Sequence, residues 1–545
     1  MSRTPLMRML RRLASEHQAA LQQGVSIETI RERQAHLQRR DFLKMAAFAA
    51  AASLAPSAKP LFAGGRQPKI AIVGAGVAGL NAALTLRDAG VAATLYESDD
   101  HFGGRIQSLT DYWKNDQVSE WCGELIDSGH VTIQGLAQRF GLALDDLHAA
   151  EPIGSTETYY FGGKYYSAAQ ADQDFQPVLE ILQAQNNAAP FPTLYNSYTE
   201  TGQYLDSISI HDWITKFVPG GHGSPFGKLL DVAYDIEFGL PTSQQSSLNL
   251  VYLLPGPTND LTLFGYSNER YHIRGGNQQL VQAIAHSLPP NTIHLNHKLV
   301  AIARQPNKQI LLTFSVGKAN GAVSYKQISF DSVILTLPFS TLRNVDYSKA
   351  GFDALKKTAI QDLGYGVNAK IMLQFEHRLW NQNGPWGLSN GNSFADTGYQ
   401  NGWDQTRAQP GETGVMVDYL GSMGAFIKPD QGDDSFSTTS KAVRRYSARF
   451  LRQIEPVFPG LSQEYNGLSA LHSPKDDPNL LGSYSCWKVG QYTLFSGYEG
   501  VRQGNIHFAG EHCSINFQGY MEGGAEEGAR AAGEILADIT AGAFS

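Results

Sequence analysis

Three glycines that follow a short apolar segment could bring backbone N–H groups close to a phosphate. The stretch IAIVGAGVAGL, residues 70–80, contains Gly74, Gly76 and Gly79. In a strand–turn–helix unit the first glycine permits the turn, the second lets a pyrophosphate approach the backbone, and the third lets helix and strand pack closely. Glu97 ends a second apolar segment eighteen residues after Gly79, where a carboxylate accepts hydrogen bonds from ribose hydroxyls. The pattern indicates dinucleotide binding, and a glycine turn with a purely structural role is the alternative.

A lysine within an apolar segment is the second group that could take part in a reaction. Lys370 lies in AKIMLQF, residues 369–375. An ammonium group among apolar side chains is unfavourable unless it has partners, so this lysine is a candidate for a role in proton transfer. The alternative is a lysine whose stem alone is buried and whose ammonium reaches solvent.

The elements that would position these residues alternate between strands and helices. The segments KIAIV, LNAALTLRDAG and VAATLYE, within residues 69–97, predict a βαβ unit around the glycine turn. Glycine turn, helix and strand recur at 271–304, a buried strand follows at 331–338, and strand, loop and helix recur at 504–539. The long segments between these units are rich in Tyr, Trp, Asn and Gln.

We therefore predict an α/β fold (α+β overall), in which a second domain is inserted into a discontinuous Rossmann-like domain. The Rossmann-like part comprises residues 64–140, 266–344 and 481–545. The inserted, partly helical part comprises residues 141–265 and 345–480 and is expected to bind substrate. A chain of 545 residues is longer than one hydrophobic core usually supports.

The charge distribution excludes some classes of partner. The net charge is −8; residues 1–63 hold ten Lys/Arg and four Asp/Glu, a balance of +6, which leaves −14 for the remainder. The net charge of −14 on residues 64–545 argues against nucleic acid as a partner, because binding of the phosphate backbone needs a positively charged surface. Three cysteines cannot form a disulfide framework, and neither they nor the fifteen histidines have metal-ligand spacing. We predict no metal site.

The basic first 63 residues have the pattern of an export signal. Arg39 and Arg40 precede Phe42, Leu43 and Lys44, and an Ala-rich, weakly apolar stretch follows at residues 45–54. That stretch is too short to span a bilayer and is typical of the core of a twin-arginine signal peptide. A basic amphipathic helix with a chance Arg-Arg pair is the alternative. We expect a periplasmic or secreted protein with no stable membrane anchor.

Three further segments, in the same order along the chain, resemble the flavin amine oxidase family. They are HFGGRIQS at residues 101–108, GYGVNAKIMLQFEHRLW at 364–380, and IHFAGEHCSINFQGYMEGGAEEGARAA at 506–532. The resemblance extends from Lys69 to the C-terminus. It implies that the discontinuous domain binds FAD and that Lys370 is the active-site lysine, which holds a water beside N5 of the flavin.

The resemblance also implies the remaining site residues. Tyr484 and Tyr520 match the two aromatic side chains that flank the substrate, and Trp487 is a candidate third wall. Ser483 occupies the position of the cysteine that tethers the flavin in animal monoamine oxidases, so we expect non-covalent FAD. The expected FAD-binding residues are Gly74, Gly76, Ala78, Gly79, Glu97, Gly104, Arg105, Gly123, Val300, Glu511, Gly519, Tyr520 and Met521.

The function that the resemblance implies is an oxidase of L-amino acids. Such an enzyme passes hydride from the alpha carbon to flavin N5, reduces O₂ to H₂O₂, and yields a 2-oxo acid and ammonia. Ile126 stands where venom-type L-amino-acid oxidases carry a carboxylate-binding arginine. Another arginine, a lysine or a tyrosine hydroxyl from residues 200–270 or 400–440 is therefore expected to reach the carboxylate, and arginine is favoured because its planar guanidinium matches a carboxylate. An oxidase of primary amines or polyamines is the alternative.

Two other classes fit less well. A nicotinamide-dependent dehydrogenase has no use for the segments around Arg105 and Tyr520, and a non-catalytic FAD-binding protein has no use for Lys370. The expected partners are an amino acid or amine substrate and O₂, and a homodimer remains open.

Overall fold

The computed structural model describes residues 67–256, 260–317, 323–430 and 434–544. The predicted leader and signal at residues 1–63 lies outside these ranges, so the export signal stays a prediction. Within the described residues, no helix is both long and apolar enough to cross a membrane.

A five-stranded parallel sheet lies at the centre of the Rossmann-like region. The strands, in spatial order, are β23 (Ile506–Phe508), β13 (Ser332–Leu335), β1 (Ile70–Val73), β2 (Thr94–Tyr96) and β9 (Ile293–His294). Helices α3 (Val77–Asp88), α10 (Gln278–Ser287) and α15 (Met521–Thr540) belong to the same region. A four-stranded sheet completes it, in the order β12 (Val323–Phe330), β11 (Ile310–Gly317), β10 (His297–Arg304) and β14 (Asp346–Lys349).

Side chains of β1 alternate between two hydrophobic cores. Ile70 and Ile72 share a core with apolar residues of α3, α10 and α15. Ala71 and Val73 instead share a core with residues of the four-stranded sheet, such as Phe314. Because successive side chains of a strand point to opposite faces, β1 lies between the helices and the second sheet. A strand buried on both faces is continuously apolar, which explains the sequence IAIV.

Helices α3 and α15 approach each other unusually closely. A Cβ atom at Gly528 of α15 would lie 2.0 Å from the carbonyl oxygen of Ala78 in α3. The Asn81 side chain donates a hydrogen bond of 2.7 Å to the carbonyl oxygen of Ala525. The glycine therefore lets the C-terminal helix pack directly against the first helix of the nucleotide-binding unit.

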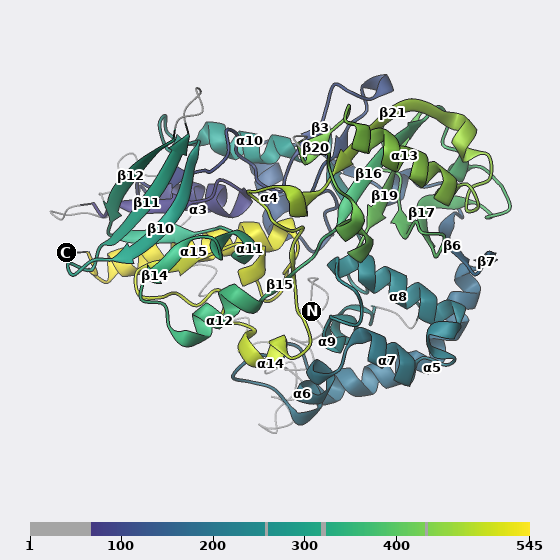
Figure 1. The fold of residues 1–545 in the computed structure, drawn as a ribbon, viewed down its shortest axis with the longest axis horizontal. Helices are drawn as coiled ribbons and strands as arrows, with labels where there is room; N and C mark the ends of the chain where they lie inside the picture. Colours follow the sequence, from purple (N-terminus) through teal and green to yellow (C-terminus); the bar gives the residue numbers. More distant parts are fainter. Residues whose placement is uncertain (1–66, 257–259, 318–322, 431–433, 545) are drawn as a thin grey trace, which may run out of the picture.

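An eight-stranded sheet dominates the second region. Its order is β20 (Phe436–Ser437), β21 (Tyr465–His472), β16 (Ala369–Phe375), β19 (Gly414–Leu420), β18 (Asn401–Gly402), β17 (Ser389–Ala395), β6 (Thr156–Phe161) and β7 (Lys164–Tyr166). Helix α13 (Lys441–Ile454) covers one face (Figure 1). All seven residues of β16 are buried between β19 and β21, so Lys370 lies on a central strand.

Five helices form a group beside this sheet (Figure 1). Their N-terminal side-chain caps explain where they begin, because each cap satisfies a backbone N–H of the first turn. Ser167 and Ser209 form complete capping boxes, and Ser224 caps a helix that has proline at its first position. The helices are α5 (Ala168–Ala188), α6 (Glu200–Ser207), α7 (Ile210–Phe217), α8 (Pro225–Phe238) and α9 (Ser247–Leu253).

Shorter elements connect these regions. The helices are α4 (Val131–Arg139), α11 (Phe339–Leu342), α12 (Ala354–Asp362) and α14 (Gln491–Phe495). The strands are β3 (Ser108–Leu109), β4 (Ser119–Glu120), β5 (Leu144–Asp146), β8 (Tyr271–Ile273), β15 (Gly364–Tyr365) and β22 (Ser485–Cys486).

The predicted α/β class with a discontinuous Rossmann-like sheet is confirmed. Its five strands come from all three segments assigned to that domain. Strand β14 (Asp346–Lys349) joins the four-stranded sheet although it lies beyond the predicted boundary at residue 344. The domain boundaries themselves stay a prediction.

Replacing Gly528 with alanine should destabilise the protein. The added methyl group collides with the Ala78 carbonyl, and overpacking of this kind costs about 1–3 kcal/mol. Gly533 of the same helix has open space around it, so Gly533→Ala should raise stability by up to about 1 kcal/mol through helix propensity. Thermal unfolding of both variants would test this, because the melting temperature should fall for Gly528→Ala and rise for Gly533→Ala. Equal shifts would contradict the close approach of α3 and α15.

Candidate active site

A cavity of 710 Å³ lies where the two regions and the helical group meet. It is lined by the turn after β1, the loop that contains Arg105, central strands β16 and β19, and the start of α15. Of the predicted FAD-binding residues, the cavity wall contains Gly74, Gly76, Ala78, Glu97, Gly104, Arg105, Gly123, Glu511, Gly519, Tyr520 and Met521.

The glycine turn is as tight as its sequence suggests. Gly74 has φ +106°, and a Cβ atom at Gly79 would lie 1.9 Å from the Gly74 carbonyl oxygen. Gly79 therefore lies behind the turn and allows α3 to start close to β1, without lining the cavity. The uncapped N-terminus of α3 faces the cavity with its positive dipole end, which suits a phosphate group.

Glu97 has a second task that the motif alone does not reveal. Its carboxylate accepts hydrogen bonds from the backbone N–H groups of Ala75, at 2.7 Å, and Asp99, at 3.0 Å. It thus ties the end of β2 to the glycine turn while lining the cavity. Its contact with a ribose stays a prediction.

Arg105, which is partly exposed, and the buried Glu511 form an ion pair of 2.9 Å. Glu511 also accepts hydrogen bonds from the Ser485 side chain, at 2.6 Å, and from the Gly519 N–H, at 2.9 Å. Burial alone would raise the pKa of Glu511, but the nearby Arg105 guanidinium and these donors hold the pKa below its usual value. Arg105 additionally donates to the Ser483 carbonyl at 2.9 Å. Through these contacts the pair connects three segments of the wall.

The start of α15 also opens toward the cavity. Tyr520 is its N-terminal flanking residue, and no side chain caps its first N–H groups. Tyr520, Met521 and Gly524 line the cavity. Unsatisfied N–H groups and the helix dipole together favour negative charge at this point.

Lys370 is surrounded by acceptors and does not reach bulk solvent. Its ammonium donates to the Glu124 carboxylate at 2.8 Å, and to the carbonyl oxygens of Cys122 and Glu120 at 2.9 and 3.1 Å. Its side chain is 6% exposed, so the solvent-reaching alternative is wrong. No local sequence pattern pointed to Glu124, which comes from a segment 246 residues away.

Glu124 is held in its charged form. Burial would raise its pKa, but the Lys370 ammonium and hydrogen bonds from Trp403 and Gln405 lower it below the ordinary value. The donor distances are 2.7 Å for Trp403 and 2.6 Å for Gln405. Lys370 and Glu124 therefore form a charge-balanced pair on the cavity wall. A water held by Lys370 stays a prediction.

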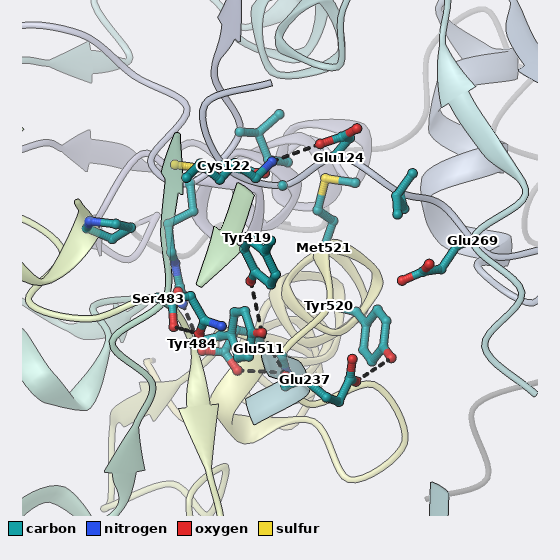
Figure 2. A pocket seen from close by; sticks show the side chains of 18 of the residues that line it. Cys122, Glu124, Glu237, Glu269, Tyr419, Ser483, Tyr484, Glu511, Tyr520 and Met521 are labelled. Atoms are coloured by element: carbon teal, nitrogen blue, oxygen red, sulfur yellow. Dashed lines mark hydrogen bonds and ion pairs between the residues drawn. The ribbon is translucent and has the colours of Figure 1, made fainter. Parts of the chain in front are cut away.

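Three tyrosines and a glutamate shape the space that was predicted to hold substrate. The Tyr484 hydroxyl donates to the Glu237 carbonyl at 2.7 Å and lies 3.0 Å from the Tyr419 hydroxyl. The Tyr520 hydroxyl donates to the Glu237 carboxylate at 3.2 Å. Tyr484 and Tyr520 thus line the cavity from separate segments (Figure 2), while Tyr419 and Glu237 were not predicted.

Two expected residues lie elsewhere. Trp487 is not a cavity wall; its ring packs against Tyr492 and Phe495 in the core. It lies three positions from Tyr484 across the short strand β22, and an odd spacing in extended chain points side chains to opposite faces. Val300 does not line the cavity either and is the extra residue of a β-bulge in β10, where a backbone group is left unpaired.

At two positions, Ile126 and Ser483, the chain differs from enzymes of the family that it resembles. Ile126 is fully buried in the core beside the cavity, and it carries no charge for a substrate carboxylate. Ser483 donates to the Asn368 side chain at 2.6 Å. Cys486 is buried outside the cavity wall. Non-covalent binding of the flavin stays a prediction. It agrees with the absence of a thiol at Ser483 and with the position of Cys486 outside the cavity wall.

Charged residues near the predicted substrate end form a set that sequence reasoning missed. Arg407 lies on the wall, within the predicted range 400–440, and donates to the Glu151 carboxylate at 3.1 Å. Glu237 and Glu269 lie on the same wall. Burial and the charges of Glu237 and Asp127 raise the pKa of Glu269 to about 8.

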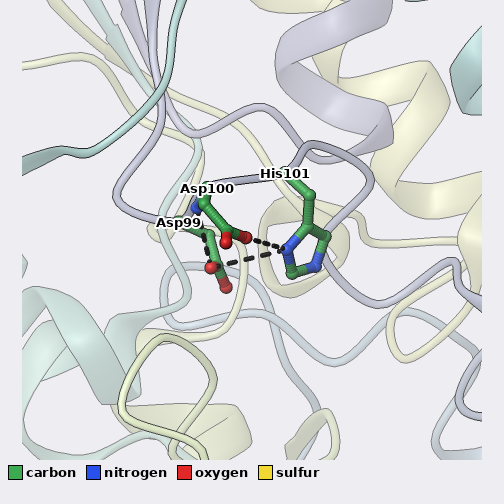
Figure 3. Close-up of side chains that lie close together, drawn as sticks. All are labelled: Asp99, Asp100 and His101. Atoms are coloured by element: carbon green, nitrogen blue, oxygen red, sulfur yellow. Dashed lines mark hydrogen bonds and ion pairs between the residues drawn. The ribbon is translucent and has the colours of Figure 1, made fainter. Parts of the chain in front are cut away.

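Asp99, Asp100 and His101 form a compact cluster (Figure 3), of which Asp99 and His101 line the cavity. Their ligand atoms lie within 4.8 Å of one another, a spacing that a metal ion could use. However, hydrogen bonds from His101 to Asp99 and Asp100 raise the pKa of His101 to about 9. The imidazole therefore carries a proton at neutral pH, and the cluster is an internal ion pair under those conditions.

Comparisons with known proteins agree with this geometry. The family model described as flavin containing amine oxidoreductase matches residues 77–536. The chain belongs to this family. It is 24% identical to a Bacillus subtilis protein named "Putative L-amino-acid oxidase YobN", over 86% of this chain and 95% of that protein. Polyamine oxidase 5 of Oryza sativa is 25% identical over 85% of this chain and 87% of its own length.

Solved structures show the same fold. Cyclohexylamine oxidase from Brevibacterium oxydans has a TM-score of 0.71 at 16% identity, over 88% of this chain and 100% of that one. Putrescine oxidase bound to putrescine has a TM-score of 0.70 at 18% identity, over 87% and 99% of the two chains.

The protein is therefore an FAD-dependent amine oxidoreductase, and its cavity fits that cofactor. The uncapped N-termini of α3 and α15 line the cavity and would stabilise the negative charge of a diphosphate or of a reduced flavin. The Gln518 amide is buried on the wall and has no hydrogen-bond partner among the described residues. A buried amide needs a partner, and a polar cofactor provides one.

Replacing Lys370 with methionine should lower turnover by about 100-fold or more, if the lysine positions the proton that the reaction moves. FAD content should stay near that of the parent enzyme, because Lys370 contacts Glu124 and carbonyl groups. Stopped-flow measurement of the reductive and oxidative half-reactions would locate the loss.

A second variant separates chemistry from stability. Lys370→Met leaves the Glu124 carboxylate buried without its cation, which is strongly destabilising. The double variant Lys370→Met/Glu124→Gln removes that charge, so it should recover thermal stability without recovering turnover. Recovery of turnover as well would assign Lys370 a structural role only.

Proposed function

We propose that the enzyme oxidises L-amino acids at the alpha carbon. The observation that carries the proposal is Arg407, a guanidinium on the same cavity wall as Tyr484, Tyr520 and Lys370. Its side chain is 10% exposed, and its bonds to Glu151 and to the Asp404 carbonyl use two of five N–H donors. The remaining donors can bind a carboxylate, for which the planar guanidinium is well shaped.

The overall reaction converts RCH(NH₃⁺)COO⁻, O₂ and H₂O into RCOCOO⁻, NH₄⁺ and H₂O₂. FAD, when bound, supplies the two-electron acceptor for the carbon–nitrogen bond and passes the electrons to O₂. Residues of the chain bind and orient the substrate. Tyr484 and Tyr520 exclude water from the reacting bond, Arg407 holds the carboxylate, and Lys370 with Glu124 provides a fixed position for a proton.

An oxidase of primary amines or polyamines is the second candidate. It is favoured by Ile126, which gives the cavity no arginine at that position, and by Glu237 and Glu269, which favour a cationic substrate. Relatives named as polyamine oxidases and the fold of putrescine oxidase agree with this alternative.

The two candidates differ in their use of a carboxylate. We expect kcat/KM for L-phenylalanine to exceed that for phenethylamine, which lacks only the carboxylate. Arg407→Met should raise KM for the amino acid by about 10- to 100-fold, the effect of losing a charged hydrogen bond, and should leave the amine unaffected. Arg274→Met, at an arginine that is 68% exposed, is the control. Preference for the amine would select the second candidate.

We also propose that the folded protein is exported through the twin-arginine route. The support is the Arg39–Arg40 pair before an Ala-rich segment. Replacing both residues with lysine should retain the precursor in the cytoplasm, because lysine does not reproduce guanidinium geometry. Cell fractionation with immunoblotting checks this, and normal delivery of the double variant would refute the route.

A further inference from the structure

Glu269 has an unusual backbone conformation. Its φ is +47°, in the left-handed region that residues other than glycine rarely adopt. The Glu269 N–H donates to the carboxylate of Asp127 at 2.8 Å, and Ser267 donates to the same oxygen at 3.1 Å. Asp127 is 1% exposed and lies 3.2 Å from His130. A buried network thus holds Glu269 in a conformation that is maintained at a cost, as is common at functional sites.

The consequence of this conformation is the direction of the side chain. The Glu269 carboxylate points into the cavity, on the side of Tyr520 and Met521 (Figure 2). Among the described residues, no hydrogen-bond donor reaches it. Glu157 on the same wall differs, because the Tyr159 hydroxyl and the Asn392 amide donate to it.

The charges around Glu269 are mostly negative. Glu237, Asp127 and Glu157 all raise its pKa, whereas Arg407 alone among the named neighbours lowers it. Arg407 is itself paired with Glu151. The Lys370 ammonium is balanced by Glu124 and adds no net charge to this wall. A ligand that brings both a positive charge and N–H donors satisfies what Glu269 lacks.

We infer that Glu269, together with Glu237, binds a second cationic group of the substrate, remote from the carbon that is oxidised. The inference rests on the proposed function, because it assigns the far end of the same substrate. Its chemistry is an ammonium or guanidinium group that donates to a carboxylate. Such a group belongs either to the side chain of a basic L-amino acid or to the distal end of a diamine.

Two matched pairs of substrates test the inference and separate these sources. L-lysine and L-norleucine differ only by the distal ammonium, as do cadaverine and pentylamine. The parent enzyme should prefer the dicationic member of a pair by about 10-fold or more in kcat/KM. Preference within the amino-acid pair assigns a basic amino acid, and preference within the amine pair assigns a diamine. No preference in either pair would overturn the inference.

Glu269→Gln should abolish this preference through KM, since the amide keeps the shape and loses the charge. Its kcat/KM for L-norleucine and pentylamine should fall much less than its kcat/KM for the dicationic members of the pairs. Glu412→Gln, at a surface carboxylate that is 87% exposed, should retain the full preference. An unchanged preference in Glu269→Gln would assign the second cation to another residue and contradict the inference.

A binding measurement keeps this result independent of the proposed reaction. The holoenzyme reduced with dithionite under anaerobic conditions cannot oxidise a ligand, so calorimetric titration reports affinity alone. The reduced parent enzyme should bind cadaverine or L-lysine at least about 10-fold more tightly than its monocationic counterpart, and Glu269→Gln should not. Selective binding without peroxide production would contradict the proposed function and leave the cation site in place. Peroxide production without selective binding would do the opposite.

Discussion

The ion pair between the partly exposed Arg105 and the buried Glu511 is the contact on which the cavity depends. It joins residues 406 positions apart in the chain, and the same carboxylate receives N–H groups from the segments of Ser485 and Gly519. Loss of the Arg105 charge would leave the buried Glu511 carboxylate without its cation, at a cost of several kcal/mol. Its geometry therefore fixes the loop after β2, the approach to β22 and the start of α15 relative to one another.

Charged side chains lie at two places on the cavity wall, and the two places suit different roles in the reaction. At one position Lys370 and Glu124 compensate each other, and Trp403 and Gln405 complete their hydrogen bonds. Such a pair can hold a proton in place without attracting a charged ligand. At the other end, no hydrogen-bond donor among the described residues reaches the Glu269 carboxylate, so a cationic ligand would itself stabilise the charged form of that group. The first arrangement suits chemistry, and the second suits selection.

The sequence was sufficient for the parts of the site that are encoded locally. The turn of Gly74–Gly79, the position of Glu97 and the entry into α15 follow from short motifs, because turn geometry and helix dipoles depend on neighbouring residues. The discontinuous sheet was predictable for the same reason, since each return to it has its own glycine turn or apolar strand.

Residues that reach the cavity from distant strands could not be predicted in this way. Glu124 and Tyr419 contact Lys370 and Tyr484 through sheet pairing and loop packing, for which a single sequence has no local signal. For Arg407, the sequence predicted only that a carboxylate-binding side chain lies within residues 200–270 or 400–440. The prediction that Trp487 lines the cavity was wrong because it relied on the short distance between Trp487 and Tyr484 in the sequence. In an extended chain, successive side chains point to opposite faces, so residues close in sequence need not face the same cavity.

The contact between α3 and α15 also determines when the cavity can exist during protein synthesis. Asn81 and Ala525, which join the two helices, are 444 residues apart. At 5–20 residues per second a ribosome needs about 20 to 90 s to make the intervening chain. Until then the face of α3 that includes Ala78 has no partner helix, and the wall formed by Tyr520 and Met521 is missing. Cofactor loading is therefore a late event, which follows synthesis of the C-terminal segment.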